Sequence, residues 1–284
     1  ALGLTAAFLQ AQDWPRFLGP DGTGASRETG LARSWPEGGP KVLWTIPLGA
    51  GFAGPAVMND EVFILDRPND KEDVLRCLSL TDGKELWSFS YPAEGKFSFN
   101  GSRTTPTVTA DAIYVIGPLG DFHCIDRTTH AVKWAKNLLT DFGGSRPNWA
   151  VSQSPLPYGN TIIAAPCSPN VGVAAFDMAT GDIIWKTASL GGLNYSSPVL
   201  TTIAGVEQVL MMTGKGAVSG IDVTSGKVLW TYSGWECNIP ITSPAPIGDG
   251  RVFISGEYGA GSAMIKVTAA DGTFSAEELY KTQV

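Results

Sequence analysis

The stretch Gly220–Trp230, GIDVTSGKVLW, decides the fold of this chain. Its frame is a small residue, an apolar residue, Asp, two free positions, Thr or Ser, Gly, three mixed positions and Trp. The same frame returns at Ala175–Trp185, at Cys124–Trp134 with His in place of Gly, and more loosely at Cys77–Trp87. A unit that recurs about every 45–50 residues indicates a repeat architecture.

Each frame is typical of a β-hairpin that ends on an aromatic anchor. The first positions continue an apolar strand, and the Asp and Thr or Ser side chains cap a tight turn by hydrogen bonds to the backbone. Gly supplies the positive φ at the point where the chain reverses. We therefore interpret Asp126, Asp177 and Asp222 as turn residues rather than as catalytic acids.

Two markers keep one register along the chain. The frame tryptophans and the prolines before each first strand recur together, at Trp44, Trp87, Trp134, Trp185 and Trp230 and at Pro55, Pro106, Pro155, Pro198 and Pro244. A proline is tolerated at a strand start because no ladder donor is needed there. Four short strands per unit, with turn signals between them, predict an all-β propeller with about five blades.

The two ends of this pattern depart from the frame. Lys41–Leu48 matches the last strand of a repeat, so we expect it to be an N-terminal closing strand. In the fifth unit Ala276 stands at the Trp position, and we expect Tyr280 to substitute after a longer turn. Either five units close with Val42–Ile46 added to the last one, or the chain is cut short and the strand around Trp44 completes a final blade that is missing. We expect the second.

The chain divides into three parts. Residues 1–11 read as a signal-peptide remnant, because Ala1–Leu9 is apolar and Leu9-Gln10-Ala11 is an acceptable cleavage site. Residues 12–40 are rich in Pro and Gly and form an expected N-terminal arm, and residues 41–284 form an incomplete propeller. The apolar start is too short to span a bilayer. We therefore expect an exported bacterial protein, periplasmic or secreted.

Composition excludes some partners. The net charge is −7, with 43% hydrophobic and 17% charged residues. An acidic balance without a basic run argues against nucleic acid and anionic membranes as partners. The chain has no CxxC pair and only two His, which gives a zinc site no support. Disulfides are possible in an exported protein, but we expect free, buried thiols at Cys77, Cys124, Cys167 and Cys237.

The arm sequence Trp14–Gly24, WPRFLGPDGTG, together with the repeated D-x-x-[TS]-G-x-x-x-W frame, resembles the pyrroloquinoline quinone (PQQ)-like β-propeller repeat family. Within it, the chain looks like the BAM lipoprotein-like assembly-factor proteins. The resemblance covers residues 13–284 and implies a truncated member of an eight-bladed class. It also implies that Trp87, Trp134, Trp185 and Trp230 pack between neighbouring blades. The departures at Ser79, Asp82 and His130 put the turn geometry of two units in doubt.

The family contains two kinds of protein, and the resemblance implies both. Quinoprotein dehydrogenases hold PQQ and calcium in the central funnel, and many carry a disulfide between adjacent cysteines. This chain has no adjacent Cys pair and no evident catalytic cluster. We therefore expect no catalytic residues, no cofactor and no metal, and favour a scaffold that binds proteins through propeller loops. A PQQ- and calcium-dependent alcohol or sugar dehydrogenase is the alternative.

The loops before the opening prolines are the candidate ligand site, because these segments point toward the funnel of a propeller. Arginines there suit the carboxylates of a ligand, and aromatic rings suit a flat ring or a glycan. A close carboxylate–amide pair, Glu236 with Asn238, is the candidate calcium ligand set. The alternative is that these groups only satisfy one another. The candidates are Arg103, Arg146, Asn148, Trp149, Asn194, Tyr195, Trp235, Glu236 and Asn238.

Overall fold

The computed structural model describes residues 12–283, and its residues fold into five four-stranded antiparallel sheets. The predicted signal-peptide remnant, residues 1–11, lies outside the described residues. The first sheet contains β1 (Ala56–Met58), β2 (Glu61–Asp66), β3 (Glu72–Ser79) and β4 (Glu85–Pro92). The second contains β5 (Thr107–Val108), β6 (Ala112–Ile116), β7 (Asp121–Asp126) and β8 (Val132–Asn137).

The remaining sheets follow the same order. The third contains β9 (Leu156–Tyr158), β10 (Thr161–Ala164), β11 (Ala174–Asp177) and β12 (Ile183–Lys186). The fourth contains β13 (Val199–Ile203), β14 (Val206–Thr213), β15 (Ala217–Asp222) and β16 (Val228–Tyr232). The fifth contains β17 (Ala245–Pro246), β18 (Arg251–Gly256), β19 (Gly261–Ala270) and β20 (Thr273–Thr282). A short 3-10 turn, η1 (Thr140–Phe142), follows β8.

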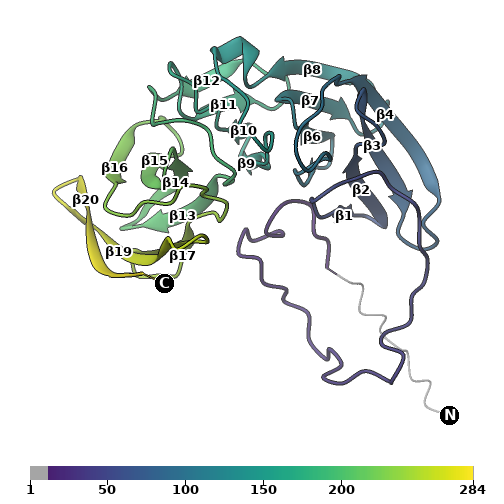
Figure 1. Cartoon of the computed structure of the whole chain (residues 1–284), viewed down its shortest axis with the longest axis horizontal. Helices are drawn as coiled ribbons and strands as arrows, with labels where there is room; N and C mark the ends of the chain where they lie inside the picture. Colours follow the sequence, from purple (N-terminus) through teal and green to yellow (C-terminus); the bar gives the residue numbers. More distant parts are fainter. Residues whose placement is uncertain (1–11, 284) are drawn as a thin grey trace.

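The five sheets stand side by side as the blades of a propeller, which confirms the predicted fold. They follow one another around an arc, with the N-terminal segment across its opening (Figure 1). Each pair of neighbouring blades encloses its own apolar core. Phe122 and Phe176, for example, lie in the core between the second and third blades, with ring centroids 5.8 Å apart.

The repeated frame forms the hairpin between the third and fourth strands of a blade. Asp177 Oδ1 accepts hydrogen bonds from the backbone N–H groups of Ala179 (2.8 Å) and Thr180 (2.9 Å). These bonds lower the pKa of Asp177, the one from Thr180 most. Gly181 follows with a φ of 76°, in the left-handed region that suits glycine. Asp126 and Asp222 make the same bonds, so these carboxylates serve the turns.

Three frame tryptophans, Trp87, Trp134 and Trp185, reach the frame turn of the following blade, whereas Nε1 of Trp230 donates to Gln208 Oε1 of its own blade at 2.7 Å. The ring of Trp134 lies against Gly181, the ring of Trp185 lies against Gly226, and Nε1 of Trp185 donates to the Val223 carbonyl at 2.9 Å. In the second blade, His130 replaces the glycine, keeps a φ of 59° and stacks on Trp87 at 4.2 Å. The departure at His130 therefore preserves both the turn and the contact.

The fifth blade keeps the anchor position with a different residue. In the first four blades, the Trp pairs with the residue just before a bulge, as Trp230 does with Gly220. In the fifth blade Tyr280 pairs with Met264 just before the bulge at Met264/Ile265. Tyr280 therefore occupies the Trp position, and the longer β19–β20 hairpin displaces Ala276 from it.

The prediction that Lys41–Leu48 forms a closing strand is wrong. Lys41–Leu48 has no strand assignment, because no neighbouring strand supplies a hydrogen-bond ladder, and Val42 and Leu43 are 73% and 71% exposed. Trp44 nevertheless behaves as a frame tryptophan. Its Nε1 donates to the Leu80 carbonyl at 2.8 Å, and its ring lies against Gly83. The segment therefore docks on the first blade through the side chain of Trp44 and not through a strand ladder.

The N-terminal arm crosses the inner strands of the blades. Trp14 and Val57 exchange two backbone hydrogen bonds, and the N–H of Val108 donates to the Pro15 carbonyl at 2.8 Å. Arg16, Phe17 and Leu18 then reach the starts of β9 and β13, where they share a small depression with Leu156 and Leu200. The arm thus covers one end of the propeller axis.

All four cysteines are free and buried, as the sequence predicts. Cys77 and Cys124 each face the frame tryptophan of their own blade across the strand pair, where a small side chain is needed. Burial raises the pKa of Cys124 to about 11 and that of Cys77 to about 12. Both thiols therefore remain protonated at neutral pH and act as small core residues.

Candidate functional site: an aromatic cavity on the propeller axis

A cavity of about 520 Å³ lies where the inner strands converge. The segments that precede the first strand of each blade form its wall, and the arm contributes Phe17. Its lining residues are Phe17, Phe52, Ala53, Gly54, Phe99, Arg103, Thr105, Trp149, Ser152, Ser154, Tyr195, Ser197, Ile241, Ser243 and Tyr258. The size and the mostly apolar lining are typical of small-molecule or anchor pockets.

A chain of hydroxyl groups ties the wall together from blade to blade. The N–H of Thr105 donates to Ser154 Oγ at 3.0 Å, and the N–H of Ser154 donates to Ser197 Oγ at 2.9 Å. The N–H of Ser197 donates in turn to Ser243 Oγ at 2.9 Å. These are the Ser or Thr residues directly before the repeated prolines. Their hydroxyls are therefore structural groups that fix the spacing of the wall.

Aromatic rings form one side of the cavity. Trp149 lies beside Tyr195 with ring centroids 5.3 Å apart, and Phe99 meets Trp149 edge to face at 6.4 Å. The N–H of Trp149 also donates to Tyr195 Oη at 3.3 Å. In the same lining, the Arg103 guanidinium lies over the Phe52 ring, 4.9 Å from its centre. The site therefore offers flat apolar surfaces next to one cation.

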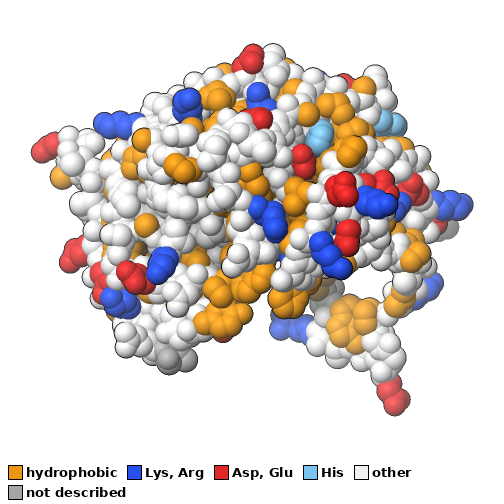
Figure 2. Space-filling view, turned by 45° about the horizontal axis from the view of Figure 1, so that its top comes forward, with side chains coloured by type: hydrophobic (Ala, Val, Ile, Leu, Met, Phe, Trp, Pro, Cys, Tyr) orange, Lys and Arg blue, Asp and Glu red, His pale blue; other side chains and the backbone are white. Residues whose placement is uncertain are grey.

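Arginines gather around Phe97 at the edge of the cavity. The guanidinium carbons of Arg67, Arg103 and Arg146 lie 5.1, 5.1 and 5.4 Å from the centre of its ring. Burial lowers the pKa of Arg103, Tyr195 opposes this shift, and the neighbouring charges of Arg146 and Arg67 lower the pKa further. In a space-filling view, Lys and Arg side chains lie directly beside hydrophobic ones near the middle of the molecule (Figure 2).

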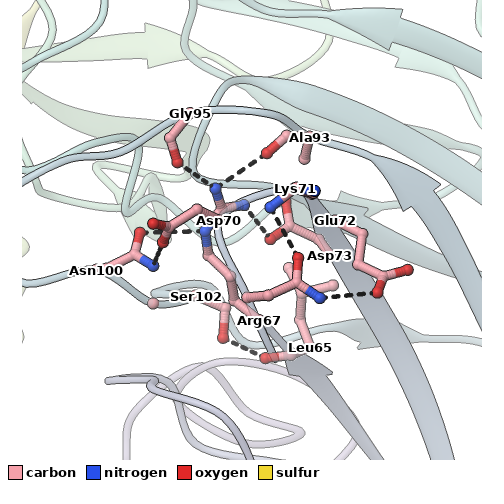
Figure 3. Close-up of polar contacts among 12 residues, drawn as sticks. Leu65, Arg67, Asp70, Lys71, Glu72, Asp73, Ala93, Gly95, Asn100 and Ser102 are labelled. Carbon is pink, nitrogen blue, oxygen red and sulfur yellow. Dashed lines mark hydrogen bonds and ion pairs between the residues drawn. The ribbon is translucent and has the colours of Figure 1, made fainter.

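Arg67 fixes the loop that carries Phe97 and Phe99. Its Nη1 donates to Asp73 Oδ1 at 2.7 Å, and its Nη2 donates to the carbonyls of Ala93 (3.0 Å) and Gly95 (2.7 Å) (Figure 3). Its Nε donates to Asn100 Oδ1 at 3.2 Å. Arg67 and Asp73 are both fully buried. This ion pair therefore acts as a structural hub behind the cavity wall.

Three of the residues singled out from the sequence line the cavity: Arg103, Trp149 and Tyr195. Arg146 lies beside Phe97 at its edge, while Asn148 is exposed and outside the lining. Asn194 is buried, and it hydrogen-bonds the Met212 carbonyl at 3.1 Å and the N–H of Ser196 at 3.0 Å. Its polar groups are therefore used within the blade.

Trp235 does not reach the funnel. It is 1% exposed, packs against Gly216 and Gly256, and donates Nε1–H to the Ala260 carbonyl at 2.9 Å. Glu236 and Asn238 are exposed on either side of buried Cys237 and lie outside the cavity lining. The structure therefore separates the candidate calcium pair from the aromatic wall. Among residues 12–283, no group of three or more His, Cys, Asp or Glu side chains is placed to hold a metal ion.

Four aromatic residues of the lining were not predicted from the sequence, namely Phe17, Phe52, Phe99 and Tyr258. Phe52 and Phe99 lie upstream of the repeated prolines, like the residues that were chosen, so position alone was a usable signal. Tyr258 comes from the β18–β19 turn, where a φ of 59° marks an unusual backbone. Phe17 belongs to the arm and carries no signal for the funnel.

Comparison with known proteins identifies the family. The family model described as outer membrane protein assembly factor BamB matches residues 27–145 and 70–281. The chain belongs to this BamB family. A comparison with curated proteins finds no match.

Solved structures share the fold of this BamB-family chain at low sequence identity. BamB from Moraxella catarrhalis is 18% identical with a TM-score of 0.58, over 85% of this chain and 67% of that one. A europium-containing methanol dehydrogenase is 12% identical with a TM-score of 0.54, and the match covers 82% of this chain and 52% of the dehydrogenase. The quinohemoprotein alcohol dehydrogenase from Comamonas testosteroni is 12% identical with a TM-score of 0.56, and the match covers 94% of this chain and 45% of the dehydrogenase. The chain therefore spans about half the length of these dehydrogenases.

Within residues 12–283, the search for a helix of membrane-spanning length and hydropathy finds none.

Proposed function

We propose that this BamB-family chain is part of a non-catalytic scaffold that works outside the cytoplasm and binds another protein through the cavity loops. The supporting observation is the rim of the cavity. Phe52, Phe99 and Tyr258 are 62%, 68% and 71% exposed around one opening. Large apolar side chains clustered at one exposed site are typical of interaction surfaces. The family description, an outer membrane protein assembly factor, points to protein partners as well.

The chemistry of the lining disfavours the dehydrogenase alternative. The lining contains no Asp, Glu, His or Cys side chain. Calcium prefers carboxylate and amide oxygens, and abstraction of a substrate proton needs a base within hydrogen-bond reach. Glu236 and Asn238, the candidate ligands, are exposed outside the lining. The described residues therefore do not fit PQQ with calcium, and we derive no step through this cofactor.

Photocrosslinking in living cells tests the scaffold proposal. A photoreactive amino acid replaces Phe99 at the rim or, as a control, Leu86, which is also exposed but lies on strand β4. We expect discrete protein adducts at position 99 and none at position 86. Equal labelling at both positions, or no adduct at position 99, would contradict the proposal. Titration with PQQ and calcium, followed by dye-linked alcohol oxidation, tests the alternative. Stoichiometric binding with turnover would establish an enzyme instead.

A further inference from the structure

Two positive charges at the cavity have no acidic partner. Among residues 12–283, neither Arg103 nor Arg146 forms an ion pair, although the whole chain carries a net charge of −7. Arg67 differs, because Asp73 neutralises it in the core. Arg103 is held by the carbonyls of Ser98, Phe99 and Gly101. Its charge therefore stands fixed at the cavity and uncompensated, with Arg146 beside it.

Three serine hydroxyls of the wall already accept hydrogen bonds from a neighbouring blade. Ser154, Ser197 and Ser243 each accept a hydrogen bond from the neighbouring blade's backbone. A glycan needs several free hydrogen-bond partners, since each sugar hydroxyl that loses water must be satisfied. A carboxylate needs one good cationic partner, and Arg103 can provide it through Nε and the second Nη1 hydrogen, since the loop carbonyls take Nη2 and the first Nη1 hydrogen. The wall thus favours an occupant with an acid group.

The apolar surface extends beyond the cavity. Phe99 and Tyr258 line the cavity and yet remain mostly exposed, so a ligand confined to the interior leaves much of both rings in water. Phe17 of the arm adds a further aromatic ring to the same lining. Binding energy at protein interfaces concentrates in aromatic anchors that fill such pockets, surrounded by a rim that excludes water. A polypeptide satisfies both the pocket and the rim.

We propose that the cavity binds a segment of a partner protein in which an aromatic side chain stands beside an Asp or Glu. The aromatic side chain enters between Phe52 and Trp149, and the carboxylate pairs with Arg103 while Arg146 adds attraction at the edge. This proposal rests on the proposed scaffold function and specifies the chemistry of its partner.

A random dodecapeptide phage library, panned against the full chain, tests this chemistry without knowledge of the partner. We expect the enriched peptides to share an aromatic residue next to Asp or Glu. A basic consensus, a consensus without an aromatic residue, or no enrichment would overturn the proposal. The enriched peptide is then synthesised with a fluorescein label, and its dissociation constant is measured by fluorescence anisotropy.

Charge variants locate the binding. We expect Arg146→Glu and Arg103→Gln each to weaken the peptide by about tenfold, and higher salt to weaken it in the unmodified protein. Arg251→Glu is the matched control, since Arg251 is exposed at the opposite end of β18 from Tyr258. Arg103 holds three loop carbonyls, whereas Arg146 is an exposed side chain with no such hydrogen bonds, so Arg146→Glu tests charge without disturbing the fold. Unchanged affinity in Arg146→Glu would overturn the proposal.

The outcomes separate this proposal from the scaffold function. Crosslinks at position 99 combined with peptides that lack the acidic–aromatic pair would reject only the partner chemistry. Absence of both crosslinks and peptides would reject both. Displacement of the peptide by micromolar PQQ would identify a small-molecule site and would also overturn the proposal.

Discussion

Gly226 lies directly against the indole of Trp185 on the preceding blade. A Cβ atom at position 226 would stand 2.6 Å from Cε3 of Trp185, closer than real Cβ contacts. The same relationship joins Gly83 to Trp44 and Gly181 to Trp134. The glycine of the frame therefore has two functions, since it allows the left-handed turn and admits the neighbouring tryptophan.

Gly226→Ala separates these two functions when it is compared with Gly272→Ala. Both glycines have positive φ, 73° and 74°, but the space around Gly272 is empty. We expect Gly272→Ala to cost about 1–2 kcal/mol from left-handed strain. Gly226→Ala adds a clash with the Trp185 ring, so its cost should be larger by about 1–3 kcal/mol. Urea unfolding measures both, and equal losses would show that the tryptophan contact does not constrain this position.

Ser197→Ala tests the hydroxyl chain around the cavity. The change removes the acceptor for the Ser154 N–H, a buried group with no other acceptor within residues 12–283. We expect a loss of about 1–3 kcal/mol in the free energy of unfolding. Ser225→Ala is the control, because this hydroxyl is exposed and water can replace it as acceptor for the Lys227 N–H, so the loss should be about 0.5 kcal/mol. Similar values for both variants would argue against a structural chain.

The sequence was informative where a pattern repeats. The frame of Asp, Gly and Trp predicts the hairpins and the contacts between blades, because each residue answers a local need for a cap, a positive φ or an anchor. Tyr280 was also predictable, since a longer turn displaces the anchor without changing its place opposite Met264. The repeat therefore carries the fold, even at the altered fifth blade.

The cavity was only partly predictable, because funnel position does not determine side-chain direction. Trp235 stands in a funnel-side loop but turns into the core, where Gly216 and Gly256 leave room for its ring. The sequence predicts the arm but not the strands that it contacts, for another reason. The arm contacts β1 and β5 through backbone groups of Trp14 and Pro15, which leave no side-chain pattern. Only the assembled structure shows that Phe17 lines the cavity.

Removal of residues 12–24 tests the role of the arm. The amides of Val57 and Val108 donate to the carbonyls of Trp14 and Pro15, so we expect their hydrogen exchange to accelerate by at least about tenfold. Leu210, in the middle of the fourth blade, is the internal control and should exchange as before. Trp14→Ala provides a milder second variant. Unchanged protection at Val57 and Val108 in both variants would show that the arm does not cover these strands.

Asp73 gives the buried hub a pH dependence. Burial raises its pKa to about 6, while the ion pair with Arg67 opposes the shift and the charge of Asp121 adds to it. An unfolded Asp has a pKa near 3.9, so the folded state binds the proton more tightly. The stability that this proton contributes is fully present below about pH 4 and is lost as the pH rises through about 6.

Asp73→Asn removes this titration while keeping the shape of the side chain. We expect the stability difference, unmodified protein minus variant, to fall by on the order of 2–3 kcal/mol between pH 4 and pH 7.5. Asp249→Asn is the control with the opposite sign, because Lys266 at 2.8 Å lowers the pKa of Asp249 and favours its charged form. For Asp249→Asn, the stability of the unmodified protein minus that of the variant should grow slightly above pH 4. Urea unfolding at four pH values measures both series. A difference that grows with pH for Asp73→Asn would mean that the charge of Arg67, rather than burial, governs this carboxyl group.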